Sequence, residues 1–159
     1  MKRSYILLLH LLIWLLLITS DALTNYLQHP LVTAGDQPFQ GLLFGKYLLI
    51  ALGFNGVAAA NFYGAYKWVG PPLFLHKHYL KAFLFAVLVL GAMVALRYAI
   101  EYGFFLPVLG WDNYGGNRWS AGHYIQNAVF FYLPRYFTYG LIYYVWEQWQ
   151  QNNKRRQEL

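Results

Sequence analysis

Long apolar runs separated by short polar segments dominate this chain of 159 residues. A helix needs about 20 apolar residues, at about 1.5 Å each, to cross the hydrocarbon core of a bilayer. The pattern predicts an all-α membrane protein: a four-helix transmembrane bundle in residues 1–149, followed by a basic tail, 150–159, that begins a linker helix. The expected spans lie at about residues 5–23, 42–66, 80–102 and 124–149.

The first run allows two interpretations. A positive start, an apolar centre from Tyr5 to Ile18 and a small-x-small ending at Ser20 and Ala22 are typical of a cleaved signal peptide. Trp14 and the later leucines favour a retained first span. Cleavage leaves the other spans in the same orientation, so the two alternatives stay open here.

Proline and glycine mark the expected breaks between the runs. Pro30, Gly35 and Pro38 interrupt a polar loop after the first span. Gly70, followed by two prolines, is expected to stop the second helix and to open a short connector that reaches Lys81. A glycine-rich aromatic loop, 111–119, precedes the fourth span.

The composition supports the membrane assignment. Hydrophobic residues make up 58% of the chain and charged residues 11%, whereas soluble domains carry about 25% charged residues. The net charge of +6 is concentrated at the ends of apolar runs, which indicates topology signals and not a nucleic-acid surface. Without a single cysteine, disulfides, thiolate metal sites and cysteine nucleophiles are excluded.

The charges also predict the orientation. The expected outer segments hold Asp21, Asp36 and Asp112 against a single basic residue, Arg118. Basic residues accumulate on the cytoplasmic side of membranes, so both termini are expected there. The residues on that inner side are Lys2, Arg3, Lys67, Lys77, Lys81, Lys154, Arg155 and Arg156.

Small residues recur in two spans at helical spacing. We expect those of the second span to form a seam against the third, because small residues allow transmembrane helices to approach closely. Asn55 and Asn61 are expected to hydrogen-bond across helices. The seam residues are Gly56, Ala60 and Gly64 in the second span and Gly91 and Ala95 in the third.

Charges inside the spans are the natural candidates for function, because burying a charge in a bilayer costs at least about 2.5 kcal/mol. Arg97 and Glu101 lie one helical turn apart near the expected outer boundary. They form either an interfacial pair, with Lys46 alongside, or part of an outward-facing ligand pocket. The loop over that pocket supplies its other candidate residues: Trp111, Asp112, Arg118 and Trp119.

Arg135 lies about 16 Å from Trp146 along the fourth span, near the middle of the membrane. Pro134 is expected to kink this helix and to free the carbonyl of Phe130. Arg135 then either hydrogen-bonds that carbonyl or Asn55, or acts as a switch. Both alternatives remain.

A heptad-like stripe follows the same helix, which predicts either a packing seam or a face that transmits movement. Its members are Tyr132, Tyr136, Tyr139, Tyr143, Trp146 and Gln150.

No catalytic or metal site is expected. His10 and His123 lie at different depths, so they do not favour bis-histidine haem ligation. His76 and His78 suit a charged surface loop better than a metal site. The loop around Asp112 lacks an oxygen ligand at Tyr114 for calcium.

Several segments together resemble the amino-terminal membrane region of LytS/YehU-type bacterial sensor histidine kinases. They are Asn61-Phe62-Tyr63, Pro72-Leu73-Phe74-Leu75, Leu96-Arg97-Tyr98-Ala99-Ile100-Glu101, and Glu147-Gln148-Trp149 with the tail. The family has a phosphoacceptor histidine box and an ATP-binding domain further on, and neither motif occurs in these 159 residues. The family also favours a basic residue where Leu73 stands.

The resemblance implies a signal-input and anchor module in the bacterial inner membrane. It would work as a homodimer among membrane lipids, require no cofactor, and reach a response regulator only through a kinase domain. Whether the chain counts as an enzyme stays open, since it contains no catalytic motif. The alternatives are a small membrane protein that binds a lipid, quinone or haem, and a membrane scaffold without ligand.

Overall fold

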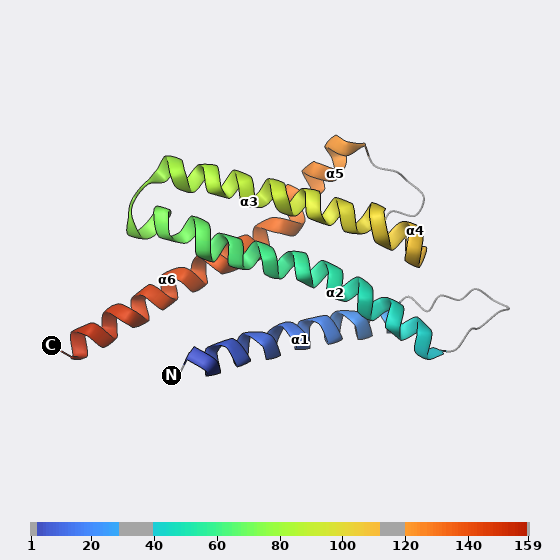
Figure 1. The fold of residues 1–159 in the computed structure, drawn as a ribbon, viewed down its shortest axis with the longest axis horizontal. Coiled ribbons are helices and arrows are strands. Elements are labelled where there is room, and N and C mark those ends of the chain that lie inside the picture. Colours follow the sequence, from blue (N-terminus) through green and yellow to red (C-terminus); the bar gives the residue numbers. More distant parts are fainter. Residues whose placement is uncertain (1–2, 29–39, 112–119, 159) are drawn as a thin grey trace.

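The computed structural model describes residues 3–28, 40–111 and 120–158, and within them it is helical throughout apart from short turns, with no strand. Figure 1 shows the helices. The α-helices are α1 (Arg3–Gln28), α2 (Gln40–Gly64), α3 (Tyr79–Ile100), α4 (Leu106–Leu109), α5 (Ala121–Asn127) and α6 (Leu133–Gln157). Wider π-helical turns connect or extend them: η1 (Ala65–Val69), η2 (Pro71–Leu75), η3 (Glu101–Phe105) and η4 (Ala128–Tyr132).

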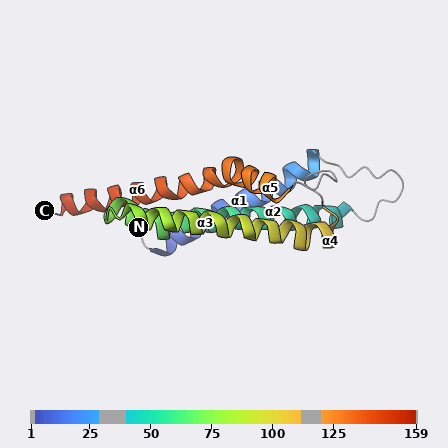
Figure 2. The same ribbon diagram turned by 90° about the horizontal axis from the view of Figure 1, so that it is seen from above.

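Helix α2 is the centre of the molecule, since α1, α3 and α6 all pack against it. In Figure 1, α1, α2 and α3 lie side by side and α6 crosses α2 and α3 at an angle. Figure 2, turned by 90°, shows that α6 lies in a different layer from α2 and α3. The two chain ends lie at the same end of the molecule in both views.

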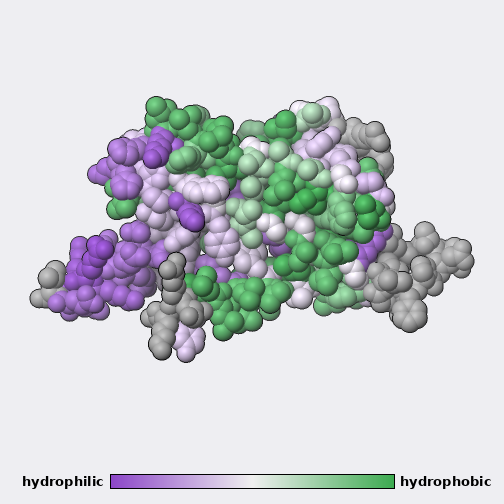
Figure 3. All heavy atoms as spheres, in the orientation of Figure 1, coloured by the Kyte–Doolittle hydropathy of each residue, from purple (hydrophilic) through white to green (hydrophobic). Residues whose placement is uncertain are grey.

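Three helical stretches in the described part of the chain are long and apolar enough to cross a membrane: Tyr5–Leu27, Phe44–Leu75 and Tyr79–Leu109. The all-helical class is therefore confirmed, and the structure is compatible with a membrane protein. The fourth predicted span is helical but rich in tyrosine and glutamine, which lower its hydropathy, so its crossing stays a prediction. Figure 3 shows hydrophobic residues over the middle of the molecule and hydrophilic ones over the C-terminal turns of α6.

The second helix runs further than the sequence predicts. Gly70 and the two prolines after it do not stop it, because they form the first turn of η2, where the missing proline N–H groups are tolerated. The chain reverses only at His76–His78, where Lys77 has a φ of 54°. The third helix likewise continues through Pro107 to Leu109 and ends at Gly110, whose φ is 61°.

The small-residue seam differs from the prediction. Gly64 does meet α3, since a Cβ built on it would lie 2.9 Å from Val89. A Cβ on Gly56 or Gly91 would have no neighbour within 4 Å, and Ala95 is exposed, whereas Ala60 is half-buried.

The predicted and observed seams differ because Gly53 and Gly64, and not Gly56, lie on the face of α2 that meets α3. A Cβ on Gly53 would lie 2.5 Å from Phe105 and 3.2 Å from Ile100. Residues eleven apart, such as Gly53 and Gly64, lie on one helix face at about 3.6 residues per turn. Gly56 points to one side of that face, so the predicted seam had the correct pair of helices but the wrong register.

Candidate functional site

The start of α6 is held against α2 by a buried amide. Asn61 is fully buried and donates a hydrogen bond of 2.7 Å to the carbonyl oxygen of Leu133. Leu133 follows the π-turn η4, in which its N–H bonds the carbonyl of Ala128. Pro134 comes next and donates no backbone hydrogen bond, so the widened turn and the Asn61 contact together fix the bend shown in Figure 1. We call the Asn61–Leu133 contact the latch.

An ionic cluster lies beside the latch. The Arg97 Nε and Glu101 Oε1 atoms are 3.0 Å apart, and the residues are 7% and 5% exposed. The Arg97 guanidinium lies 3.9 Å from the ring centroid of Tyr132 and 5.2 Å from that of Phe54. The Tyr132 hydroxyl donates a 2.6 Å hydrogen bond to the carbonyl of Phe54. We call Phe54, Arg97, Glu101 and Tyr132 the kink cluster.

The kink cluster joins α2, α3, η3 and η4. The predicted pairing of Arg97 with Glu101 is confirmed, and the pair is buried inside the bundle. Lys46 makes no ion pair with Glu101 among the described residues. Arg97 Nη1 has no hydrogen-bond partner in the described part of the chain, so the aromatic faces of Tyr132 and Phe54 supply much of its stabilisation.

The predicted outer pocket is only partly described. Trp111 packs edge-on against Tyr47, with ring centroids 5.7 Å apart, and its backbone N–H donates to the carbonyl of Phe105. Asp112, Arg118 and Trp119 lie outside the described residues. The pocket beneath this loop therefore stays a prediction.

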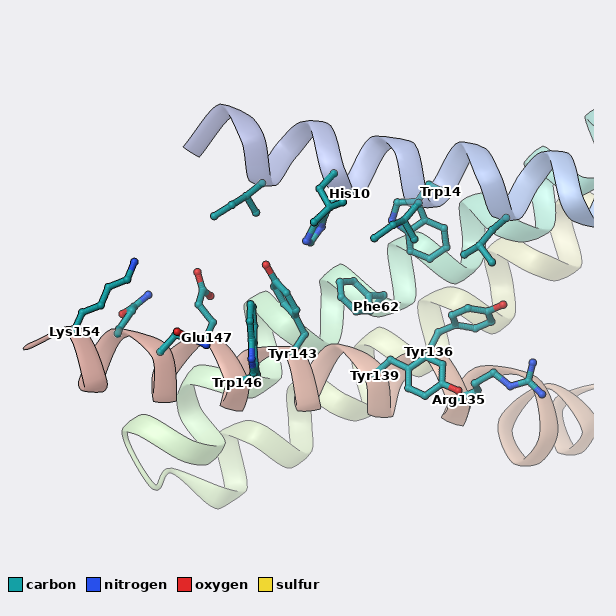
Figure 4. Close-up of a pocket in the computed structure, with 16 residues that line it drawn as sticks. His10, Trp14, Phe62, Arg135, Tyr136, Tyr139, Tyr143, Trp146, Glu147 and Lys154 are labelled. Carbon is teal, nitrogen blue, oxygen red and sulfur yellow. The ribbon is translucent and has the colours of Figure 1, made fainter. Parts of the chain in front are cut away.

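A groove of about 960 Å³ separates α1 from α6, with Phe62 of α2 at its base. Figure 4 shows the side chains of both helices pointing into it. Along its length the lining changes from polar at the end of α6 to aromatic and aliphatic further in. We call it the α1–α6 groove. It is lined by Ile6, Leu9, His10, Ile13, Trp14 and Leu17 of α1 and by Arg135, Tyr136, Tyr139, Tyr143, Trp146, Glu147, Gln150, Gln151 and Lys154 of α6.

Arg135 lines the deep end of this groove. Its side chain is exposed and forms no ion pair with the described residues. The proposed bonds from Arg135 to the Phe130 carbonyl and to Asn55 are absent from the described part of the structure. Asn55 instead donates to Asp21, at 2.7 Å, and to the carbonyl of Ala51, at 3.0 Å, and Asn61 is the asparagine that reaches α6. Hydrogen bonding across helices by both asparagines is confirmed.

Three hydrogen-bonding side chains, those of His10, Trp14 and Tyr63, meet between α1 and α2. Trp14 Nε1 donates to the Tyr63 hydroxyl oxygen at 3.2 Å, and that hydroxyl lies 2.7 Å from His10 Nδ1. Since indole only donates, Trp14 occupies one lone pair of the Tyr63 oxygen, and the Tyr63 proton is available to His10 Nδ1. In the tautomer in which Nδ1 accepts this proton, Nε2 carries the N–H and offers a donor.

The polar end of the groove has one acidic side chain. Glu147 accepts a short hydrogen bond from the Tyr66 hydroxyl. His10 stands further in, against the ring of Tyr143, with centroids 5.1 Å apart. Within the described residues, no group of three or more His, Cys, Asp or Glu residues is placed to hold a metal ion.

Sequence reasoning found one wall of the groove and missed the other. The stripe on α6 is present, but from Tyr136 to Gln150 it lines the groove, whereas Tyr132 belongs to the kink cluster. On α1, Ile6, Leu9, Ile13 and Leu17 recur at spacings of three and four and were available as a signal. That they face a groove depends on the angle at which α6 crosses α2.

No protein-family model, curated protein or solved structure matches this chain.

Proposed function

We propose that residues 1–149 form the membrane-embedded input and anchor module of a two-component sensor histidine kinase. In this proposal the chain crosses a bacterial inner membrane four times, with both termini in the cytoplasm. The basic residues at the inner segments support this topology. So does the position of both chain ends at the same end of the molecule (Figure 1), as an even number of crossings requires.

The continuity of α6 is the observation that carries the proposal. From Leu133 to Gln157 the helix is unbroken, a length of about 37 Å. The latch and the kink cluster hold its start, and its last turns carry Lys154, Arg155 and Arg156. A change of angle at the latch would therefore displace the tail more than any other part of α6.

The proposed output follows from this geometry. The tail would lead into a kinase domain, through which a homodimer of the protein would signal to a response regulator. The kink cluster is the proposed switch, because its ion pair and aromatic contacts join α2 and α3 to the irregular turn η4. Pi-helical turns are frequent at such functional positions.

The test is a chimera in which the full chain is followed by the cytoplasmic half of a LytS/YehU-type kinase. Pro134→Ala and Asn61→Leu both change the hold on the start of α6. They are expected to shift resting autophosphorylation by about fivefold or more, the lower range of allosteric couplings. The matched control is Phe130→Leu, at a side chain that is 70% exposed and outside the latch.

Reporter fusions at Lys154 and within residues 111–119 should report opposite sides of the membrane in every variant. If they report the same side, the four-span topology is wrong. If topology is correct but kinase output is equal in all three variants, α6 is an anchor and not a transmitter.

A second candidate function, binding of a lipid or quinone, is favoured by the α1–α6 groove. Its size falls within the range of about 300–1,000 Å³ that is typical of ligand pockets, and it combines apolar walls with a few polar groups. An optical spectrum of the purified protein tests the haem form of this alternative. A protein without ligand or output in either experiment would be a scaffold.

A further inference from the structure

We propose that the α1–α6 groove binds one anionic glycerophospholipid from the cytoplasmic leaflet. The phosphate would lie near Lys154, and an acyl chain would follow α1 into the membrane. This inference rests on the membrane placement of the proposed function, and not on kinase signalling.

The order of side chains along the groove matches the order of groups in a phospholipid. The polar end of the groove, where α6 leaves its apolar part, is lined by Gln150, Gln151 and Lys154. Their amide and ammonium groups are hydrogen-bond donors suited to a phosphate. Beyond them come the aliphatic side chains of α1, Ile6 to Leu17, opposite the aromatic rings of α6. As far as Arg135 at the deep end, a polar headgroup and an apolar chain would each meet their own kind of surface.

His10 provides a donor at the depth of the ester carbonyls. It contacts Tyr143, which precedes Gln150 by seven residues, or about 10 Å along the helix. When Nδ1 accepts from the Tyr63 hydroxyl, the other ring nitrogen of His10 is an N–H donor. Ester carbonyl oxygens accept hydrogen bonds and carry no charge, so they suit this position between the headgroup and the acyl chains.

The positive charge at the polar end of the groove favours an anionic headgroup. Lys154 is exposed there, and Arg155 and Arg156 follow it. Glu147 is the acidic residue of the lining, and its carboxylate already accepts a hydrogen bond from the Tyr66 hydroxyl. Basic clusters next to a membrane attract anionic lipids of the cytoplasmic leaflet.

A neutral isoprenoid quinone is the competing occupant, with its ring near Arg135. The guanidinium of Arg135 points away from the polar end of the groove in Figure 4. Residues 135 and 154 are separated by about 28 Å along the axis of α6. A quinone with its ring near Arg135 would leave the polar end of the groove facing an isoprenoid tail. The phospholipid leaves no such mismatch at that end.

The test uses the full chain in phosphatidylcholine vesicles with traces of spin-labelled lipid. The immobilised fraction of spin-labelled phosphatidylglycerol should exceed that of spin-labelled phosphatidylcholine. Ile13→Trp fills the groove and should abolish this excess. Leu12→Trp is the matched control, because Leu12 is an exposed neighbour on α1 that does not line the groove.

The headgroup position is tested by charge removal. Lys154→Gln should lower the preference for phosphatidylglycerol about fivefold, as expected for one basic residue at the surface. Arg155→Gln should lower it clearly less, because Arg155 does not line the groove. His10→Phe keeps an aromatic ring and should reduce immobilisation of both lipids.

Several outcomes would overturn the proposal. Equal losses for Lys154→Gln and Arg155→Gln would show general surface attraction and no site. Equal immobilisation of the two lipids would exclude the anionic headgroup, and displacement by decylubiquinone but not by unlabelled phosphatidylglycerol would assign the groove to a quinone. Fusion reporters on the same side would refute the membrane placement itself, whereas correct topology without lipid preference refutes only the lipid site.

Discussion

Two arginines in apolar helices have opposite environments. Arg97 is 7% exposed, paired with Glu101 and stacked on two aromatic rings. Arg135 is exposed on the wall of the α1–α6 groove and has no ion pair within the described residues. One arginine therefore serves packing between helices, whereas the other is available to whatever enters the groove.

The contrast extends to the two sides of α6. One side is fastened to α2 by the latch and by Gly140, where the backbones come close. The other side faces α1 across the groove. The proposed input role would use both properties, because a helix that is held at one end and free along one face can change its angle without unfolding the bundle.

Replacing the two arginines should give the largest difference. Arg97→Met removes the cation from a buried carboxylate and its contact with Tyr132, and should cost about 3–5 kcal/mol of unfolding free energy. Arg135→Met should change it by no more than about 0.5 kcal/mol. Reversible unfolding in mixed detergent micelles, followed by circular dichroism, measures both. Similar losses for the two variants would contradict the comparison.

Glycine substitutions sharpen the contrast between close and open helix faces. A Cβ on Gly140 would lie 2.3 Å from the carbonyl oxygen of Phe62, so Gly140→Ala should force α6 away from α2 and cost about 1–3 kcal/mol. Gly91→Ala meets no atom within 4 Å and should stabilise α3 by up to about 1 kcal/mol. The same unfolding experiment applies. A tolerated alanine at Gly140 would mean that α6 does not depend on this close approach.

Local spacing explains what the sequence could predict. Arg97 and Glu101 are four residues apart on one helix, so their pairing needs no knowledge of the fold. The stripe on α6 was recognised from spacing for the same reason. The surroundings of the stripe could not be predicted from spacing. The spacing of residues along a helix shows which of them share a face, but it does not show what that face contacts.

The incorrect details all depend on contacts between distant segments. Asn61 and not Asn55 reaches α6, because the start of α6 crosses α2 near the C-terminal end of α2. Gly70 is followed by prolines that look like a helix end, yet the Tyr144 ring packs against that glycine, 2.7 Å from where its Cβ would be, and the helical path continues. Hydropathy marks three helical stretches as able to span a membrane, whereas the tyrosines and glutamines of α6 lower its hydropathy, so its crossing stays a prediction.

The smallest predicted difference concerns two tyrosines of the same stripe. The Tyr132 hydroxyl donates to the Phe54 carbonyl at 2.6 Å, whereas that of Tyr139 makes no hydrogen bond within the described residues and its side chain is 51% exposed. Tyr132→Phe should cost about 1 kcal/mol, the usual net contribution of one hydrogen bond. Tyr139→Phe should cost almost nothing, and both changes preserve the rings.

This pair isolates the hydroxyl from the aromatic face. Phenylalanine at position 132 still presents a ring to Arg97, so the cation–π contact is largely kept, and any loss reports the link between η4 and α2. Combining Tyr132→Phe with Asn61→Leu extends the comparison to the latch. A combined loss that departs from the sum of the single losses would show that the two contacts act as one unit at the start of α6. A purely additive loss would mean that the latch and the kink cluster hold α6 independently.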